Sequence, residues 1–116
     1  MLPKNQRLNL SLEFKEVASG QRVETDNLVI FFKSAAISSP KIGIALTKKN
    51  FPSATERNRA KRLTSSAIQA LYLKLRSNLK IVIMPKGKIL QSDSASLVGE
   101  IEGKKGLFDV ASNQSN

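Results

Sequence analysis

The first part of the chain has apolar residues at helical spacing. Leu10, Phe14 and Val17 lie three or four residues apart, which is typical of one side of a short helix. Ser11 is a candidate for its N-terminal cap, and Gly20 is expected to end it. The sequence therefore predicts a short first helix with one apolar side.

Short apolar and alternating runs then predict three strands. Residues 21–24 and 28–33 flank a polar turn, residues 25–27, and are typical of a hairpin. After a loop that ends at Pro40, a third strand is expected over residues 41–47. These strands supply most of a small sheet.

The strongest pattern in the chain is helical and covers residues 57–76. Its apolar stripe consists of Ala60, Leu63, Ala67, Leu71 and Leu75. A buried strand over 80–84, stopped by Pro85, follows, and a last helix is expected over 94–107. Residues 111–116 are polar and are expected to form a disordered tail.

The order of these elements predicts an α+β fold. A helix, three strands, a long helix, a strand and a last helix favour a mixed four-stranded sheet with three helices packed against it, a small α/β sandwich. The long helix makes the crossover between the third and fourth strands. At 116 residues and 41% hydrophobic composition, the chain can bury one modest core, so one domain is expected over residues 1–110.

The composition is strongly basic and lacks the usual catalytic side chains. A formal net charge of +10 favours nucleic acid as the partner. No apolar run approaches the roughly 18 residues of a membrane span, and no signal-peptide segment begins the chain, so a cytoplasmic protein with no membrane partner is expected. Histidine and cysteine are absent, and the nine carboxylates show no catalytic spacing. The sequence assigns no metal site.

Cations gather around the predicted start of the long helix. Six of them lie within fifteen residues: Lys48, Lys49, Arg57, Arg59, Lys61 and Arg62. Cations at a helix N-terminus oppose the macrodipole at a cost of about 0.3–1 kcal/mol each, but the same arrangement suits a bound phosphate. Asn58 either hydrogen-bonds a phosphate or sugar or caps the helix. Phe51 is expected to anchor the basic loop rather than to stack on a base.

Aromatic and small residues suggest a second contact surface. Period two in the second strand places Phe31 on the same face as Lys33, so Phe31 is a candidate for stacking on an unpaired base, or else it packs under a helix. Gly43 and Ala45 are the small residues of the third strand. They leave either an open floor for a groove that admits an extended strand or space for a tightly packed helix. Phe14 is either a core residue or part of the same surface.

Together these residues resemble the bacterial ribonuclease P protein component. Residues 41–49 (KIGIALTKK), a seven-residue gap and residues 57–63 (RNRAKRL) resemble the core of that family. Upstream, Arg7-Leu8, residues 13–17 and Gly20 match its opening helix. The resemblance covers roughly residues 1–90.

The resemblance implies a fold of the ribosomal-protein S5 domain 2-like type, with a left-handed crossover through the long helix. It implies a protein subunit that helps a catalytic RNA remove the 5′ leader of precursor tRNA, an endoribonuclease reaction in which the protein chain is non-catalytic and Mg2+ is required by the RNA. Binding of the catalytic RNA is expected from Lys48, Lys49, Arg57, Asn58, Arg59, Lys61 and Arg62. The leader is expected in a groove with Phe14, Phe31 and Lys33.

The chain also differs from the usual family pattern at a few positions. These are Ala18, Ser65, Ser66, Gln69 and Lys80. The main alternative is a general or ribosomal-type RNA-binding protein with no role in cleavage, which would show no preference for substrates that carry a leader. A DNA-binding helix and a self-sufficient metal nuclease are disfavoured, because base-reading side chains and a carboxylate cluster are both lacking.

Overall fold

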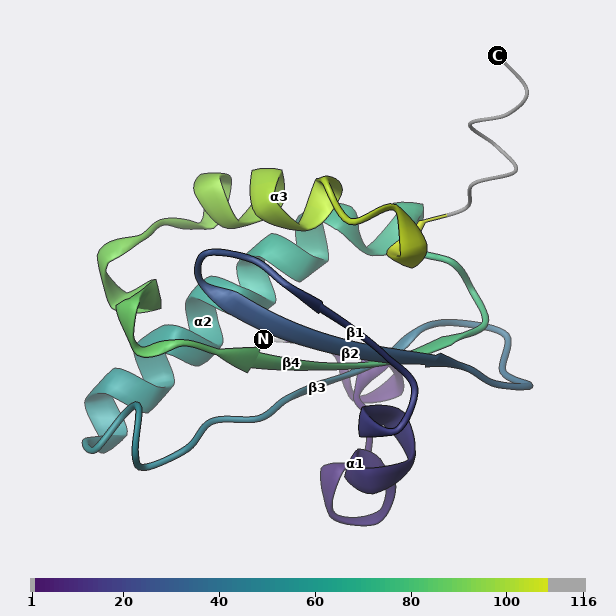
Figure 1. Cartoon of the computed structure of the whole chain (residues 1–116), viewed down its shortest axis with the longest axis horizontal. Coiled ribbons are helices and arrows are strands. Elements are labelled where there is room, and N and C mark those ends of the chain that lie inside the picture. Colours follow the sequence, from purple (N-terminus) through teal and green to yellow (C-terminus); the bar gives the residue numbers. More distant parts are fainter. Residues whose placement is uncertain (1, 109–116) are drawn as a thin grey trace.

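The computed structural model describes residues 2–108 and contains the main elements in the predicted order (Figure 1). These are α1 (Leu10–Ala18), β1 (Gln21–Glu24), β2 (Leu28–Ser34), β3 (Lys41–Ile44), α2 (Ala54–Leu71), β4 (Leu79–Pro85) and α3 (Ser94–Glu102). Short 3-10 helices lie at Lys4–Gln6, Tyr72–Lys74, Gly87–Gln91 and Lys105–Leu107.

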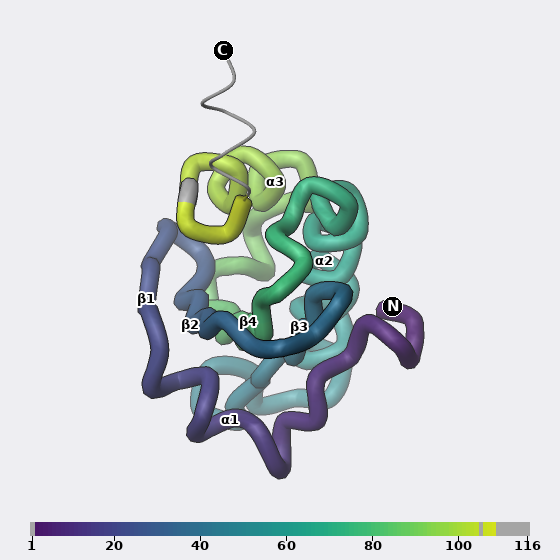
Figure 2. Tube along the Cα trace, turned by 90° about the vertical axis from the view of Figure 1, so that its right-hand side faces the viewer, coloured from purple at the N-terminus to yellow at the C-terminus, as the bar shows by residue number. Residues whose placement is uncertain are grey.

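The strands form one mixed sheet in the order β1-β2-β4-β3. The pairs β1–β2 and β2–β4 are antiparallel, and β3–β4 is parallel. Helix α2 connects the two parallel strands and lies with α3 on one face of the sheet, while α1 lies on the other (Figures 1 and 2). The predicted α+β sandwich with three helices is therefore confirmed, and the handedness of the crossover stays a prediction.

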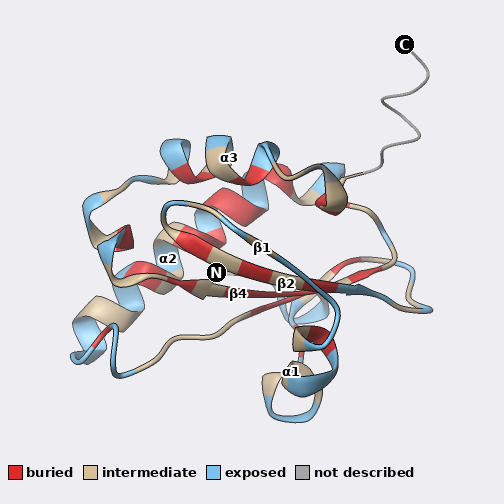
Figure 3. Ribbon diagram, viewed as in Figure 1, coloured by how far each residue is buried: buried red, intermediate tan, exposed pale blue. Residues whose placement is uncertain are grey.

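The alternation of β2 divides the core into two parts. Leu28, Ile30 and Phe32 are buried under α2 and α3 in the main core (Figure 3). On the other face, a smaller cluster of Leu8, Val17 and Val82 is buried beneath α1. The partly buried side chains packed against this α1 cluster are Leu10, Phe14, Phe31, Ala45 and Met84.

Helix α1 begins and ends for reasons that differ from the prediction. Its N-cap position is Asn9 rather than Ser11, and the Asn9 N–H donates to the Glu13 carboxylate at 3.3 Å. Gly20 does follow the helix, but none of the described residues has a positive φ, so it is no left-handed cap. A Cβ at Gly20 would lie 2.5 Å from the Phe32 carbonyl oxygen. Gly20 is needed because the chain passes this close to β2.

Helix α2 begins three residues before the predicted start. Ser53 and Glu56 form a capping box, in which the Ser53 hydroxyl accepts from the Glu56 N–H at 3.1 Å and the Glu56 carboxylate accepts from the Ser53 N–H at 3.4 Å. Asn58 is therefore not the cap. The helix ends at Leu71, short of the predicted Arg76, and continues as a 3-10 turn.

The remaining boundaries shift by a few residues. Strand β3 ends at Ile44 rather than residue 47, and β4 includes Pro85. Helix α3 ends at Glu102 because Gly103 follows it, so the predicted helix over 94–107 is too long. The predicted tail, residues 111–116, lies outside the described residues.

The N-terminal segment covers the β3 edge of the sheet. The Leu8 N–H donates to the Ile42 carbonyl at 3.0 Å, and Arg7 forms a parallel bridge to the same residue. The Lys41 ammonium donates to the Asn5 carbonyl, and Leu2 is buried in the main core. Figure 2 shows this segment beside β3 and α2.

Candidate nucleic-acid interface

The basic loop, residues 45–53 between β3 and α2, is held against α2 by Arg57. Its Nη1 donates to the carbonyl oxygens of Phe51 at 2.8 Å and Pro52 at 3.3 Å. Phe51 itself is fully buried in the main core, which confirms its predicted role as the loop anchor. Arg57 therefore has structural contacts as well as a charge.

The N–H groups at the start of α2 are partly satisfied by side chains of the same segment. The capping box pairs the Ser53 N–H and the Glu56 N–H, and Glu56 places a carboxylate next to the first turn. Arg57 is the fourth residue of the helix, and Lys61 and Arg62 lie in the third turn. The Glu56 carboxylate disfavours an anion at the helix N-terminus itself, so phosphate contacts here are expected from the cationic side chains.

The predicted cationic residues are mostly exposed. Asn58, Arg59 and Arg62 are exposed on α2, and Lys61 is half-buried. The Arg59 guanidinium makes only a long contact, 3.5 Å, to the Leu90 carbonyl. Lys48 and Lys49 are also exposed, in the turn that follows β3. None of the six cations forms an ion pair with another residue of the range 2–108, so the basic cluster carries uncompensated positive charge.

The structure brings Phe14 and Phe31 together on the α1 face. Both side chains are half-buried against the α1 cluster. The sequence allowed each of them to be either a core residue or a surface residue, and each is partly both. The floor is closed at Gly43, where an added Cβ would lie 2.5 Å from Leu10 Cδ2. Beyond Gly43 the half-buried Ala45 and Met84 continue this face. We call the partly exposed residues of this face, Phe14, Phe31, Ala45 and Met84, the groove surface, after the leader groove that the sequence predicts.

Lys33 lies two residues from Phe31 on the same face of β2, outside the apolar cluster that packs against α1. It is exposed and pairs across the sheet with Lys80, whereas Phe31 pairs with Val82. The Lys80 end of the sheet is the one that faces the acidic side of α1. The structure therefore packs Phe14 and Phe31 against one apolar cluster and places Lys33 beside Lys80, which pairs with the acidic side of α1.

The acidic side of α1 was not predicted as part of the site. Lys80 Nζ lies 2.6 Å from Glu13 and 3.4 Å from Glu16, and these side chains are 17%, 27% and 45% exposed. The hydrogen bond to Glu13 raises the pKa of Lys80, and the same bond lowers the pKa of Glu13. Two glutamates three residues apart on one helix side were the only sequence signal.

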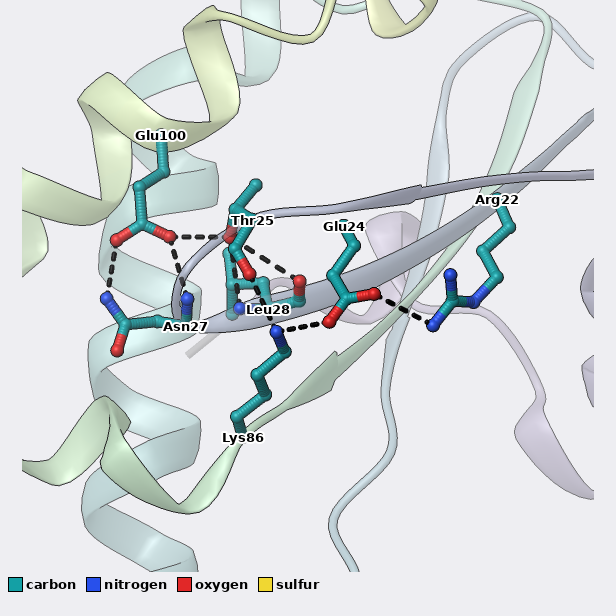
Figure 4. Close-up of polar contacts among 7 residues, drawn as sticks. All are labelled: Arg22, Glu24, Thr25, Asn27, Leu28, Lys86 and Glu100. Atoms are coloured by element: carbon teal, nitrogen blue, oxygen red, sulfur yellow. Dashed lines mark hydrogen bonds and ion pairs between the residues drawn. The ribbon is translucent and has the colours of Figure 1, made fainter.

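A second group of charged side chains lies on β1 (Figure 4). It borders the groove surface, because Arg22 pairs with Phe31 across the two strands. Glu24 pairs with Lys86 and, at 3.1 Å, with Arg22; Lys86 also donates to the Thr25 carbonyl at 2.9 Å. The hydrogen bond from Lys86 is the main cause of a lowered Glu24 pKa. Lys86 therefore joins the carboxylate of β1 to the start of the β1–β2 turn.

The carboxylates do not form a metal site among the described residues. No group of three His, Cys, Asp or Glu side chains within residues 2–108 is placed to hold an ion. Glu13, Glu16 and Glu24 are each engaged by a cation instead. Over the same part of the chain, no helix is both long and apolar enough to cross a membrane.

The fold and the surface define a class: a small basic α+β domain with an uncompensated cationic helix and loop. The family described as Ribonuclease P matches residues 2–105. The chain therefore belongs to the ribonuclease P protein family.

Individual relatives agree with this assignment. The ribonuclease P protein component of Rippkaea orientalis is 33% identical over 107 residues, 87% of this chain and 84% of the relative. That of Caldanaerobacter subterraneus subsp. tengcongensis is 31% identical, with 88% of each chain covered.

Solved structures agree in fold. The RNase P protein of Thermotoga maritima superimposes with a TM-score of 0.74 at 20% identity, covering 84% of this chain and 92% of that one. The Staphylococcus aureus RNase P protein gives a TM-score of 0.72 at 17% identity, covering 84% and 90%.

Proposed function

We propose that this protein, as the protein subunit of the ribonuclease P ribonucleoprotein, binds the catalytic RNA with its basic cluster and the 5′ leader of precursor tRNA with its groove surface. The holoenzyme is an endoribonuclease that matures the 5′ end of tRNA. The family match over residues 2–105 is the observation that carries this proposal. The cytoplasm is the proposed location.

The basic cluster is proposed to contact phosphates of the catalytic RNA. Arg59, Lys61 and Arg62 suit this role because they lack acidic partners in the described range, and Asn58 is exposed beside them for a phosphate or sugar. The exposed Lys48 and Lys49 extend the cluster onto the loop. Arg57 contributes charge and holds the loop in place at the same time.

The groove surface is proposed to hold the single-stranded leader. Phe14 and Phe31 are half exposed there, and stacking of an unpaired base on an aromatic ring contributes roughly 1–3 kcal/mol. Lys33 is exposed and lies outside the apolar cluster that holds Phe31, so its proposed role is to attract leader phosphates electrostatically rather than to line the stacking surface.

The cleavage chemistry is proposed to belong to the RNA. Within residues 2–108 the carboxylates are dispersed or paired with lysines, so they do not fit a Mg2+ site. When bound to the RNA, Mg2+ would supply an activated water and stabilise developing charge on the phosphate. The protein's part is to bind and orient the two RNAs.

The test is cleavage of a leader-bearing precursor tRNA at low Mg2+ with a bacterial ribonuclease P RNA. Reactions contain the RNA alone, the protein alone, or both. We expect stimulation only in the combined reaction. No stimulation with the RNA from the same organism would favour a general RNA-binding protein, and cleavage by the protein alone would overturn the non-catalytic role.

A substitution at Phe31 tests whether the leader binds to the groove surface. Phe31→Ala is expected to weaken binding of leader-bearing substrate to the holoenzyme, because a stacking surface is lost, while leaderless tRNA binds as before. Equal losses of affinity for the two substrates would show that the leader does not bind to this surface.

A further inference from the structure

A row of three lysines crosses the sheet beneath one side of α1. Lys80 on β4 is paired in register with Lys33 on β2 and Lys41 on β3. Like charges directly opposite one another in a sheet are destabilising. Here Glu13 and Glu16 of α1 face the middle of the row and pair with Lys80.

These ion pairs and the groove surface lie on opposite sides of α1. Glu13 precedes Phe14 by one residue, which turns the two side chains about 100° apart around the helix. Along β4, Lys80 and Met84 lie on the same face, on either side of Val82. Glu13 holds the helix at the Lys80 end, so Phe14 is directed toward the Met84 end, where the groove surface lies.

Apart from these ion pairs, the rotation of α1 about its own axis is set by the apolar contacts of Leu10, Phe14 and Val17. The helix has nine residues, no side-chain N-cap bond, and one fully buried residue, Val17. Side chains extend about 5 Å from a helix axis, so a roll of roughly 20° would move the Phe14 ring by about 2 Å. Such a displacement is more than half of a van der Waals contact distance and would break a stacking geometry.

We infer that Lys80 is a positioning residue for the leader: its ion pairs to Glu13 and Glu16 hold α1 in the rotation that sets Phe14 beside Phe31. This inference rests on the proposed function of the groove surface. It assigns a role to a position at which the chain departs from the usual family pattern. Lys80 does not touch the leader in this arrangement, and it acts through α1.

The test compares Lys80→Gln with the matched control Lys74→Gln. Lys74 also pairs with a glutamate, Glu102 at 3.6 Å, but on the other face of the sheet. Each variant loses one positive charge and one lysine. Binding to the assembled holoenzyme is measured for leader-bearing precursor tRNA and for leaderless tRNA.

We expect Lys80→Gln to weaken binding of the leader-bearing substrate about 3- to 10-fold with less than a 2-fold change for leaderless tRNA. Lys74→Gln should change neither, and Lys80→Arg should restore binding because arginine can pair with both glutamates. Equal losses for both substrates in Lys80→Gln, or no loss, would overturn the inference.

A second measurement uses the free protein and does not depend on the leader. Amide hydrogen exchange in residues 12–18 should accelerate several-fold in Lys80→Gln and stay unchanged in Lys74→Gln. Unchanged exchange in both variants would overturn the inference even if the proposed function holds. Accelerated exchange without any leader preference in the unsubstituted protein would instead contradict the groove assignment.

Discussion

At the scale of single residues, Gly20 allows the chain that follows α1 to pass close to β2. A methyl group at this position would meet the Phe32 carbonyl oxygen at 2.5 Å and Lys33 Cβ at 2.9 Å. We expect Gly20→Ala to lower the free energy of unfolding by about 1–3 kcal/mol, measured by urea denaturation. Gly99→Ala is the control: it has open space in the middle of α3 and should stabilise by about 0.5–1 kcal/mol.

Ser65 has a buried hydroxyl with no hydrogen-bond partner among the described residues. Burying such a group costs about 1–3 kcal/mol, so Ser65→Ala should raise the free energy of unfolding. The exposed neighbour Ser66 gives the matched control, because Ser66→Ala changes helix propensity alone. A loss of stability in Ser65→Ala relative to Ser66→Ala would contradict this reading of the core.

Substitutions at Arg57 and Arg62 distinguish a structural role of an arginine from the role of its charge alone. Arg57→Ala removes the bonds to Phe51 and Pro52 and should cost about 1 kcal/mol of unfolding free energy, whereas the exposed Arg62→Ala should stay within about 0.5 kcal/mol. Thermal and urea denaturation would measure both. Identical stabilities would mean that the loop does not depend on Arg57.

At the scale of elements, Glu100 joins α3 to the β1–β2 turn (Figure 4). Its carboxylate accepts from the Thr25 hydroxyl and from the Asn27 side-chain amide, and from the Asn27 N–H at 3.1 Å. Burial raises the pKa of Glu100, but these hydrogen bonds outweigh it and the net pKa is lowered. The ionised form is thus the one that the fold stabilises.

The lowered pKa of Glu100 determines how its contribution to stability changes with pH. A folded pKa below the unfolded value gives stability that is complete above the unfolded pKa, about 4.3 for glutamate, and is lost as the pH falls through the folded pKa. Glu100→Gln should therefore cost about 1–2 kcal/mol at pH 7 and progressively less below pH 4. Urea denaturation across this range is the measurement, with Glu102→Gln, on an exposed ion pair, as the control. A pH-independent difference would contradict the role of the charge.

The sequence predicted the elements well because each has a local signal. The stripe of α2 and the alternation of β2 are short-range patterns, and the topology followed from their order. The early start of α2 also had a local signal, the Ser53-x-x-Glu56 capping box. The end at Leu71 had none, since the next residue, Tyr72, is held by a hydrogen bond of 2.7 Å to the distant Pro40 carbonyl.

Predicting the site was limited by contacts that are distant in sequence. The cations of the basic cluster could be read from spacing alone, but their partners could not. Lys80 meets Glu13, and Lys86 meets Glu24, across more than sixty residues. Lys33 was grouped with Phe31 by strand period. Only the docking of α1 shows that Lys33 lies beside the Lys80 ion pairs and outside the apolar cluster that holds Phe31.

At the scale of the whole molecule, the net charge of +10 governs association with RNA. If about five phosphates are neutralised, the slope of log K against log salt should be roughly −3.5 to −4.5. Lys61→Ala or Arg62→Ala should flatten the slope by about one unit, because one phosphate contact is lost. Titrations of the catalytic RNA at several salt concentrations would measure this. An unchanged slope in both variants would exclude the start of α2 from the interface.

The N-terminal segment on β3 also has a consequence for self-association. A sheet edge offers unpaired N–H and C=O groups to any other strand, and residues 2–8 occupy part of the β3 edge. The opposite edge, β1, is only four residues long and carries Arg22 and Glu24. A shortened chain that starts after Leu8 would expose both the β3 edge and the core around Leu2. Such a variant should form intermolecular β-sheet and precipitate.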